Sequence, residues 1–103
     1  MTERDEQYFQ SQAEKYGIPE HMHGAIVRYI VHGIPPGDFL SAVISNDLFE
    51  AIGRADDKNI KRIDAFVKYF YMEAPAQSHG SERDVERWIE RGGLNGLPKT
   101  QAE

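Results

Sequence analysis

DKNIKRIDAFVKYFYME, which spans Asp57 to Glu73, is the most strongly periodic stretch of the chain and decides the predicted fold. On a helical wheel of about 100° per residue, its large apolar side chains fall on one arc, as in a helix that faces a core. These side chains are Ile60, Ile63, Phe66, Val67, Phe70 and Tyr71. Asp56 or Asp57 can cap the first turn, and Pro75 ends the helix. We therefore predict an all-α fold, a compact bundle of four to six short helices around a central helix near residues 57–73.

The opposite arc of this predicted helix is basic. It carries Lys58, Lys61, Arg62 and Lys68. Tyr69 and Met72 lie among these cations, and an aromatic ring and a thioether on an outward face are typical of a protein contact surface. The alternative is that the N-terminal segment or the C-terminal tail covers both side chains, or that they are simply exposed.

The segments before the central helix also show helical patterns. Residues 2–16 are polar, with a thin apolar stripe of Phe9, Ala13 and Tyr16 that leaves open whether this helix packs on its own chain or on a neighbour. A second helix is predicted over residues 19–32, followed by a glycine that can take the left-handed conformation. Gly24 lies inside this helix at a cost of up to about 1 kcal/mol relative to alanine, which predicts a close contact with another helix.

Shorter helices are predicted in the rest of the chain. Two of them meet near Asn46, which interrupts the apolar repeat before the central helix. Ser81 and Asp84 resemble a capping box at the start of a last helix, which Gly92 and Gly93 end. The predicted partners of the central helix in the core are Ile26, Ile30, Leu40, Val43, Ile44, Leu48, Ile52, Val85 and Trp88.

Length and composition predict one acidic domain. The 103 residues divide into an N-terminal helical or flexible segment (1–17), a single helical domain (18–97) and a disordered tail (98–103). The formal net charge is −5, and the chain has no cysteine, so it can form neither disulfides nor thiolate sites. No apolar run reaches the length of about 20 residues that a membrane span needs, and the N-terminus is unlike a secretory signal. We therefore expect a cytoplasmic protein that does not bind membranes.

Histidines suggest a metal site only at first sight. His21 and His23 are two positions apart, so on a helix their side chains diverge, and neither His32 nor His79 lies at a spacing that would join them. The chain has no cysteine ligand and no HExxH motif. We expect no metal site and no cofactor.

Catalytic residue types are present without a catalytic spacing. They are Asp38, Ser41, Ser45, Asp47, His32 and His79. The chain contains neither GxSxG nor a P-loop, and the two aspartates are explained as helix caps. We therefore expect a protein that is not an enzyme.

Two binding functions remain. The basic arc with Tyr69 and Met72, and a stiff elbow at Pro35 and Pro36, are candidate surfaces for binding another protein or for homo-oligomerisation. The alternative is local binding of a nucleic acid or nucleotide through the basic arc, against which the acidic total charge argues.

Residues 32–48, HGIPPGDFLSAVISNDL, resemble a pattern in small proteins encoded by tailed phages and prophages (HGxPPGxFLxAVxxNDL). The resemblance continues through GRAD at residues 53–56, EAP at 73–75, GS at 80–81, WI at 88–89 and GGLNG at 92–96. That group has no established activity, so the resemblance implies a genetic setting and no site residues. It favours a non-enzymatic inhibitor or regulator of a host protein, acting in the cytoplasm of the host cell.

Overall fold

The computed structural model describes residues 2–96, and it has no strand among them. The helices are α1 (Thr2–Lys15), η1 (Glu20–Met22), α2 (His23–His32), α3 (Asp38–Ile44), α4 (Leu48–Arg54), α5 (Asp57–Ile60), α6 (Ile63–Met72), η2 (Ala76–Ser78), α7 (Glu82–Arg91) and η3 (Gly93–Gly96). The predicted all-α class is confirmed, with seven α-helices in the described range rather than four to six. The tail predicted at 98–103 and the last residue of the predicted domain 18–97 lie outside the described residues.

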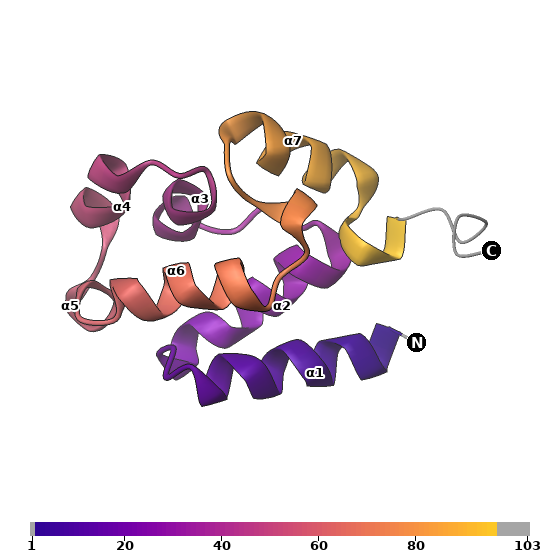
Figure 1. Ribbon diagram of the computed structural model, residues 1–103, viewed down its shortest axis with the longest axis horizontal. Coiled ribbons are helices and arrows are strands. Elements are labelled where there is room, and N and C mark those ends of the chain that lie inside the picture. Colours follow the sequence, from indigo (N-terminus) through magenta and orange to yellow (C-terminus); the bar gives the residue numbers. More distant parts are fainter. Residues whose placement is uncertain (1, 97–103) are drawn as a thin grey trace.

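The helices form two groups around a shared core. Figure 1 shows α1 and α2 lying together along one side of the molecule, with α6 crossing α2, and with α3, α4 and α7 on the other side. α3 packs on α4, α6 and α7, and η3 covers one end of α2. None of the described helices is long and apolar enough to cross a membrane.

α2 is the most deeply buried helix. Six of its ten residues are buried, against four of ten in α6. The Tyr29 hydroxyl donates a 2.6 Å hydrogen bond to the Ser78 carbonyl, and the Trp88 indole N–H donates to the Tyr29 and Ile30 carbonyl oxygens at 3.0 and 3.2 Å. Both carbonyls belong to the last turn of α2, where backbone partners become scarce, and the Tyr29 carbonyl also accepts from the Gly33 N–H at 2.9 Å. Trp88 therefore completes the C-terminal end of α2.

The single central helix predicted over residues 57–73 is wrong, because the chain breaks it at Lys61 and Arg62. Asp56 caps α5 by accepting from the backbone N–H groups of residues 58 and 59 at 3.0 and 2.7 Å. Arg62 then leaves helical geometry, with φ −124° and ψ 22°, so α6 begins with its own phase. The break between α5 and α6 rotates the predicted stripe out of register.

The buried stripe of α6 differs from the predicted one as a result. Ile60, Val67 and Tyr71 were predicted in the core and are 39%, 53% and 79% exposed. Phe66 and Phe70 are buried as predicted, whereas Tyr69, predicted on the outer basic face, is fully buried.

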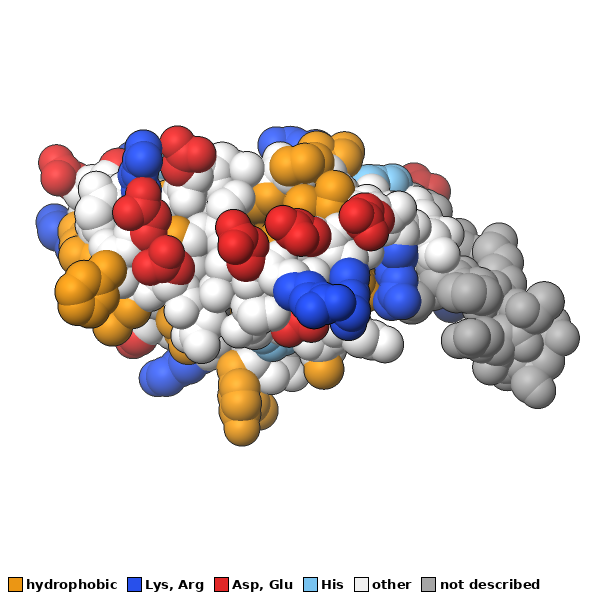
Figure 2. Space-filling view, turned by 90° about the horizontal axis from the view of Figure 1, so that it is seen from above, with side chains coloured by type: hydrophobic (Ala, Val, Ile, Leu, Met, Phe, Trp, Pro, Cys, Tyr) orange, Lys and Arg blue, Asp and Glu red, His pale blue; other side chains and the backbone are white. Residues whose placement is uncertain are grey.

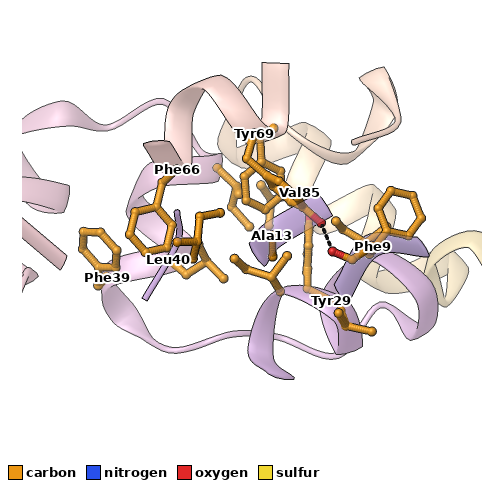
Figure 3. Packing of buried hydrophobic residues seen from close by; sticks show 14 of the residues in the cluster. Phe9, Ala13, Tyr29, Phe39, Leu40, Phe66, Tyr69 and Val85 are labelled. Atoms are coloured by element: carbon orange, nitrogen blue, oxygen red, sulfur yellow. Dashed lines mark hydrogen bonds between the residues drawn. The ribbon is translucent and has the colours of Figure 1, made fainter. Parts of the chain in front are cut away.

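α1 explains why Tyr69 is buried. Phe9 and Ala13 of α1 are buried, and the Tyr69 hydroxyl donates a 2.9 Å hydrogen bond to the Phe9 carbonyl, drawn as a dashed line in Figure 3. Tyr8 and Tyr16 donate to the two carboxylate oxygens of Glu73, each at 2.8 Å. The N-terminal segment therefore packs on its own chain and covers Tyr69, which is one of the two alternatives that the sequence left open.

Two glycines allow the closest approach between segments. A Cβ on Gly33 would lie 2.6 Å from the Gly93 backbone nitrogen, and one on Gly93 would lie 2.5 Å from the Gly33 nitrogen. Both residues also have positive φ, 69° and 70°. The close contact predicted at Gly24 is wrong, because a Cβ there would meet only the flexible Arg28 side chain.

Replacing Gly33 with alanine should lower the free energy of unfolding by at least about 1–2 kcal/mol, the ordinary cost of left-handed geometry, with the clash against Gly93 in addition. Gly53 provides the control, because it lies within α4 with open space around its Cα. Gly53→Ala should raise the free energy of unfolding by up to about 1 kcal/mol. Urea denaturation measures both, and equal effects of the two substitutions would contradict the close contact.

Replacing Phe66 with alanine should lower the free energy of unfolding by about 3–5 kcal/mol, because the ring is fully buried and leaves a cavity. Phe66 packs edge-to-face on Phe39 with ring centroids 5.0 Å apart, and both are visible in Figure 3. Tyr71→Ala on the same helix is the control and should change the free energy by less than about 0.5 kcal/mol. An unchanged melting temperature for Phe66→Ala would show that α6 does not pack on the core as described.

Stability should fall at alkaline pH because of two buried tyrosines. Burial, and then the charge of Glu73, raise the pKa of Tyr69; burial, and then the charge of Asp84, raise the pKa of Tyr29. The unfolded chain loses these protons near pH 10, earlier than the folded chain, so the stabilisation is complete below about pH 10 and is lost as pH rises. Tyr69→Phe should therefore flatten the decrease in unfolding free energy above about pH 10, as measured by denaturation at several pH values. An equally steep decrease in this variant would contradict the assignment.

Candidate interaction surface

The structure separates the residues predicted to bind a partner. Tyr69 is removed from the surface by α1, which corrects the prediction for that residue. Met72, together with Lys58, Lys61, Arg62 and Lys68, is exposed. Pro35 and Pro36 lie in the α2–α3 connection, which Figure 1 shows well away from α5. These residues do not form one surface, and their role as partner contacts stays a prediction, as does nucleic-acid binding by the cations.

A different surface follows from the turn between α3 and α4. Asn46 takes the left-handed conformation with φ 65°, and the Asp47 carboxylate caps α4 by accepting from the Glu50 N–H at 3.2 Å. The sharp turn leaves α4 lying on α3 with only Ala51 buried.

The apolar side chains of α4 therefore point outward. Leu48 and Ile52 were predicted in the core and are 61% and 48% exposed, because α4 is short and its inward face is occupied by alanine. Phe49, which the predicted core does not contain, is 90% exposed. Of the other predicted core partners, Val43 is half-buried and the rest are buried.

Leu48 of α4 lines the same hollow as Val67 on the exposed edge of α6. Val67 and Tyr71 lie four residues apart on one face of α6, and the break before this helix has turned them away from the core. Leu48, Phe49, Ile52, Val67 and Tyr71 are the exposed large apolar side chains of this region, and we call them the apolar surface.

A groove runs between α3, α4 and α6 through this surface. It consists of two hollows of about 60 and 180 Å³ that share Val43, Asn46 and Val67. Leu48 lines the first hollow and Tyr71 the second. The groove is open to solvent and lined mainly by apolar side chains.

His79 lies at the Tyr71 end of the groove. Its ring is 5.8 Å from the Phe70 ring, and its Nδ1 is 3.0 Å from the Ser78 Oγ. Burial lowers the pKa of His79, which favours the neutral ring. The next residue, Gly80, donates its N–H to the Ile44 carbonyl at 2.8 Å and fixes this end of the groove to α3.

An acidic cleft of about 290 Å³ adjoins the groove and shares Ala42 and Asp47 with it. Its lining contains Asp38, Asp47, Glu50, Glu82 and one cation, Arg54. Arg54 lies 3.0 Å from the Glu50 carboxylate and 3.3 Å from the Asp38 carboxylate. Figure 2 shows acidic side chains spread over the face seen from above, with a group of basic side chains beside them and hydrophobic side chains elsewhere on the face.

The cleft also brings together part of the predicted catalytic set. Ser41 and Ser45 line it beside Asp38 and Asp47, but neither histidine does. His32 instead contacts Glu6 at 2.6 Å on α1, and His79 belongs to the groove. The serines therefore have no neighbouring histidine in the cleft. The absence of enzymatic activity stays a prediction.

The histidines are separated from one another in the described part of the chain. His21 contacts the Asp56 carboxylate at 3.0 Å, whereas His23 is buried, with its Nε2 2.7 Å from the Ile18 carbonyl oxygen. Among residues 2–96 no three or more histidine, aspartate or glutamate side chains form a group that could hold a metal ion.

Comparisons with protein families, with curated proteins and with solved structures gave no match to this chain.

Proposed function

We propose that this protein acts without catalysis, by binding another protein through the apolar surface around the α3–α4–α6 groove. The observation that supports this is that three exposed large apolar side chains, Leu48, Val67 and Tyr71, line one apolar groove, while Phe49 and Ile52 are exposed on α4, which borders it. Single exposed apolar side chains are common, but contiguous ones beside a hollow are typical of interaction sites.

The aromatic residues of this surface are suited to act as anchors. Phe49 and Tyr71 are 90% and 79% exposed, so a partner that covers them removes much of two aromatic side chains from water. Burial stabilises a complex by about 25 cal/mol per Å² of apolar area, and tyrosine is frequent among the residues that dominate binding energies. The groove that Tyr71 lines offers a pocket for side chains of the partner.

The resemblance to small phage and prophage proteins supports a setting for this activity. In that setting the partner is a host protein, and the protein inhibits or regulates it in the host cytoplasm. Short non-enzymatic chains with one exposed apolar surface are suited to this role, because they need only to cover a site on the partner.

Capture of partners from a bacterial lysate, followed by mass spectrometry, tests the proposal when two variants of α6 are compared. Val67→Asp places a charge in the groove, whereas Met72→Asp changes an equally exposed residue outside it; the two are 53% and 64% exposed. We expect Met72→Asp to retain the partner and Val67→Asp to lose it, with at least about 30-fold weaker binding if Val67 contributes 2 kcal/mol.

A variant of the basic residues between α5 and α6 tests the alternative binding surface. The double variant Lys61→Glu, Arg62→Glu should retain the partner, because neither residue lines the groove. Loss of the partner in this variant, with retention in Val67→Asp, would refute the apolar surface and favour the basic one. Circular dichroism of each variant checks that the helices are intact.

A further inference from the structure

The apolar groove and the acidic cleft adjoin each other, so one ligand can occupy both. They share Ala42 and Asp47, at the turn where α3 passes into α4. A ligand that lies along the groove therefore has one flank over apolar side chains and the other at the mouth of the cleft.

We infer that the segment of the partner that occupies the groove is an amphipathic helix, with lysine or arginine on the flank that faces the acidic cleft. This inference rests on the proposed function and specifies the chemistry of the partner. Apolar side chains of the helix fill the groove between Leu48 and Tyr71, and a cationic side chain enters the cleft beside Asp47 and Glu82.

The charges of the cleft support a cationic ligand. Four carboxylates line the cleft against one guanidinium group, and Arg54 already contacts Glu50 and Asp38. Asp47 and Glu82 have no cation within ion-pair distance in the described part of the chain. A lysine or arginine placed between them gains charge-assisted hydrogen bonds, whereas an acidic or phosphate-bearing ligand is repelled.

The shape of the site favours a helix. No strand edge is present in residues 2–96 that an extended peptide could join by backbone hydrogen bonds. The groove instead lies between helices and presents apolar positions along its length, an arrangement that takes up the i, i+3, i+4 and i+7 side chains of a ligand helix.

A second copy of this chain is a poorer occupant. A two-fold symmetric dimer places the same surface on both sides of the interface. That arrangement would bring two clefts, each with four carboxylates and one guanidinium, close together. Like charges at a desolvated interface are unfavourable, so the acidic cleft selects against self-association.

Selection from a display library of amphipathic peptides tests the inference. The peptides have about 16 residues, about 24 Å as a helix, and their polar positions are drawn equally from lysine, glutamate and glutamine. We expect the peptides enriched on the native protein to carry apolar residues at helical spacing and an excess of lysine on one flank. Val67→Asp should abolish their binding.

A variant that removes charges from the acidic cleft, with a matched control, tests whether the cleft binds a cation. Asp47→Asn with Glu82→Gln removes two charges while asparagine keeps the helix cap, and it should weaken peptide binding about tenfold and reduce its dependence on salt. Glu14→Gln with Glu20→Gln removes two charges elsewhere and should leave binding unchanged. Two results would overturn the inference of a basic partner and leave the proposed function intact. In the first, the peptides that depend on Val67 are neutral or acidic; in the second, their binding is unchanged by the cleft variant.

The other outcomes separate the two proposals further. If Val67→Asp weakens the binding of none of the selected peptides, the helical ligand is refuted. The proposed function is refuted as well only if Val67→Asp also leaves the capture of partners from lysate unchanged. A dimer in sedimentation experiments that Val67→Asp dissociates would identify a second copy as the occupant and overturn the inference.

Discussion

The contact between the C-terminal end of α2 and the segment around α7 holds the two halves of this protein together. Trp88 donates its indole N–H to the Tyr29 and Ile30 carbonyl oxygens at the end of α2, and Gly33 meets Gly93 at a distance that no side chain permits. An unsatisfied buried carbonyl costs about 1–3 kcal/mol, so the tryptophan cannot be displaced cheaply. α2 is fixed at this end by η3, and α1 packs along it.

That arrangement determines which surfaces are covered. α1 lies along α2 and covers Tyr69, with Tyr8 and Tyr16 joined to Glu73 at the end of α6. Nothing comparable covers the opposite edge of α6 in the described chain, where Val67 and Tyr71 face solvent. The exposed apolar surface is therefore the edge of the core that no helix covers.

The sequence predicted the helices better than their phases. Asn46, Ser81 and Gly33 each have a local conformational reason to stand at a helix end, so the two short helices near Asn46, the N-cap at Ser81 and the end of α2 are confirmed. The break at Arg62 has no such local signal in the sequence. Asp56 is a suitable N-cap for a single helical turn such as α5 and equally for a long helix. The groove could not be predicted, because Leu48 and Val67 follow core-like spacing and only tertiary packing excludes them from the core.

The net charge of −5 gives the apolar surface a second physical consequence. An exposed apolar surface favours association with any similar surface, including that of another copy, because apolar burial is not directional. Charge repulsion between copies opposes this association, and carboxylates next to the groove make the opposition strongest where the surface would meet its own copy. The same carboxylates attract a cationic partner. Acidic groups beside an apolar groove therefore oppose self-association of the chain and, in the proposed binding site, favour a ligand of opposite charge.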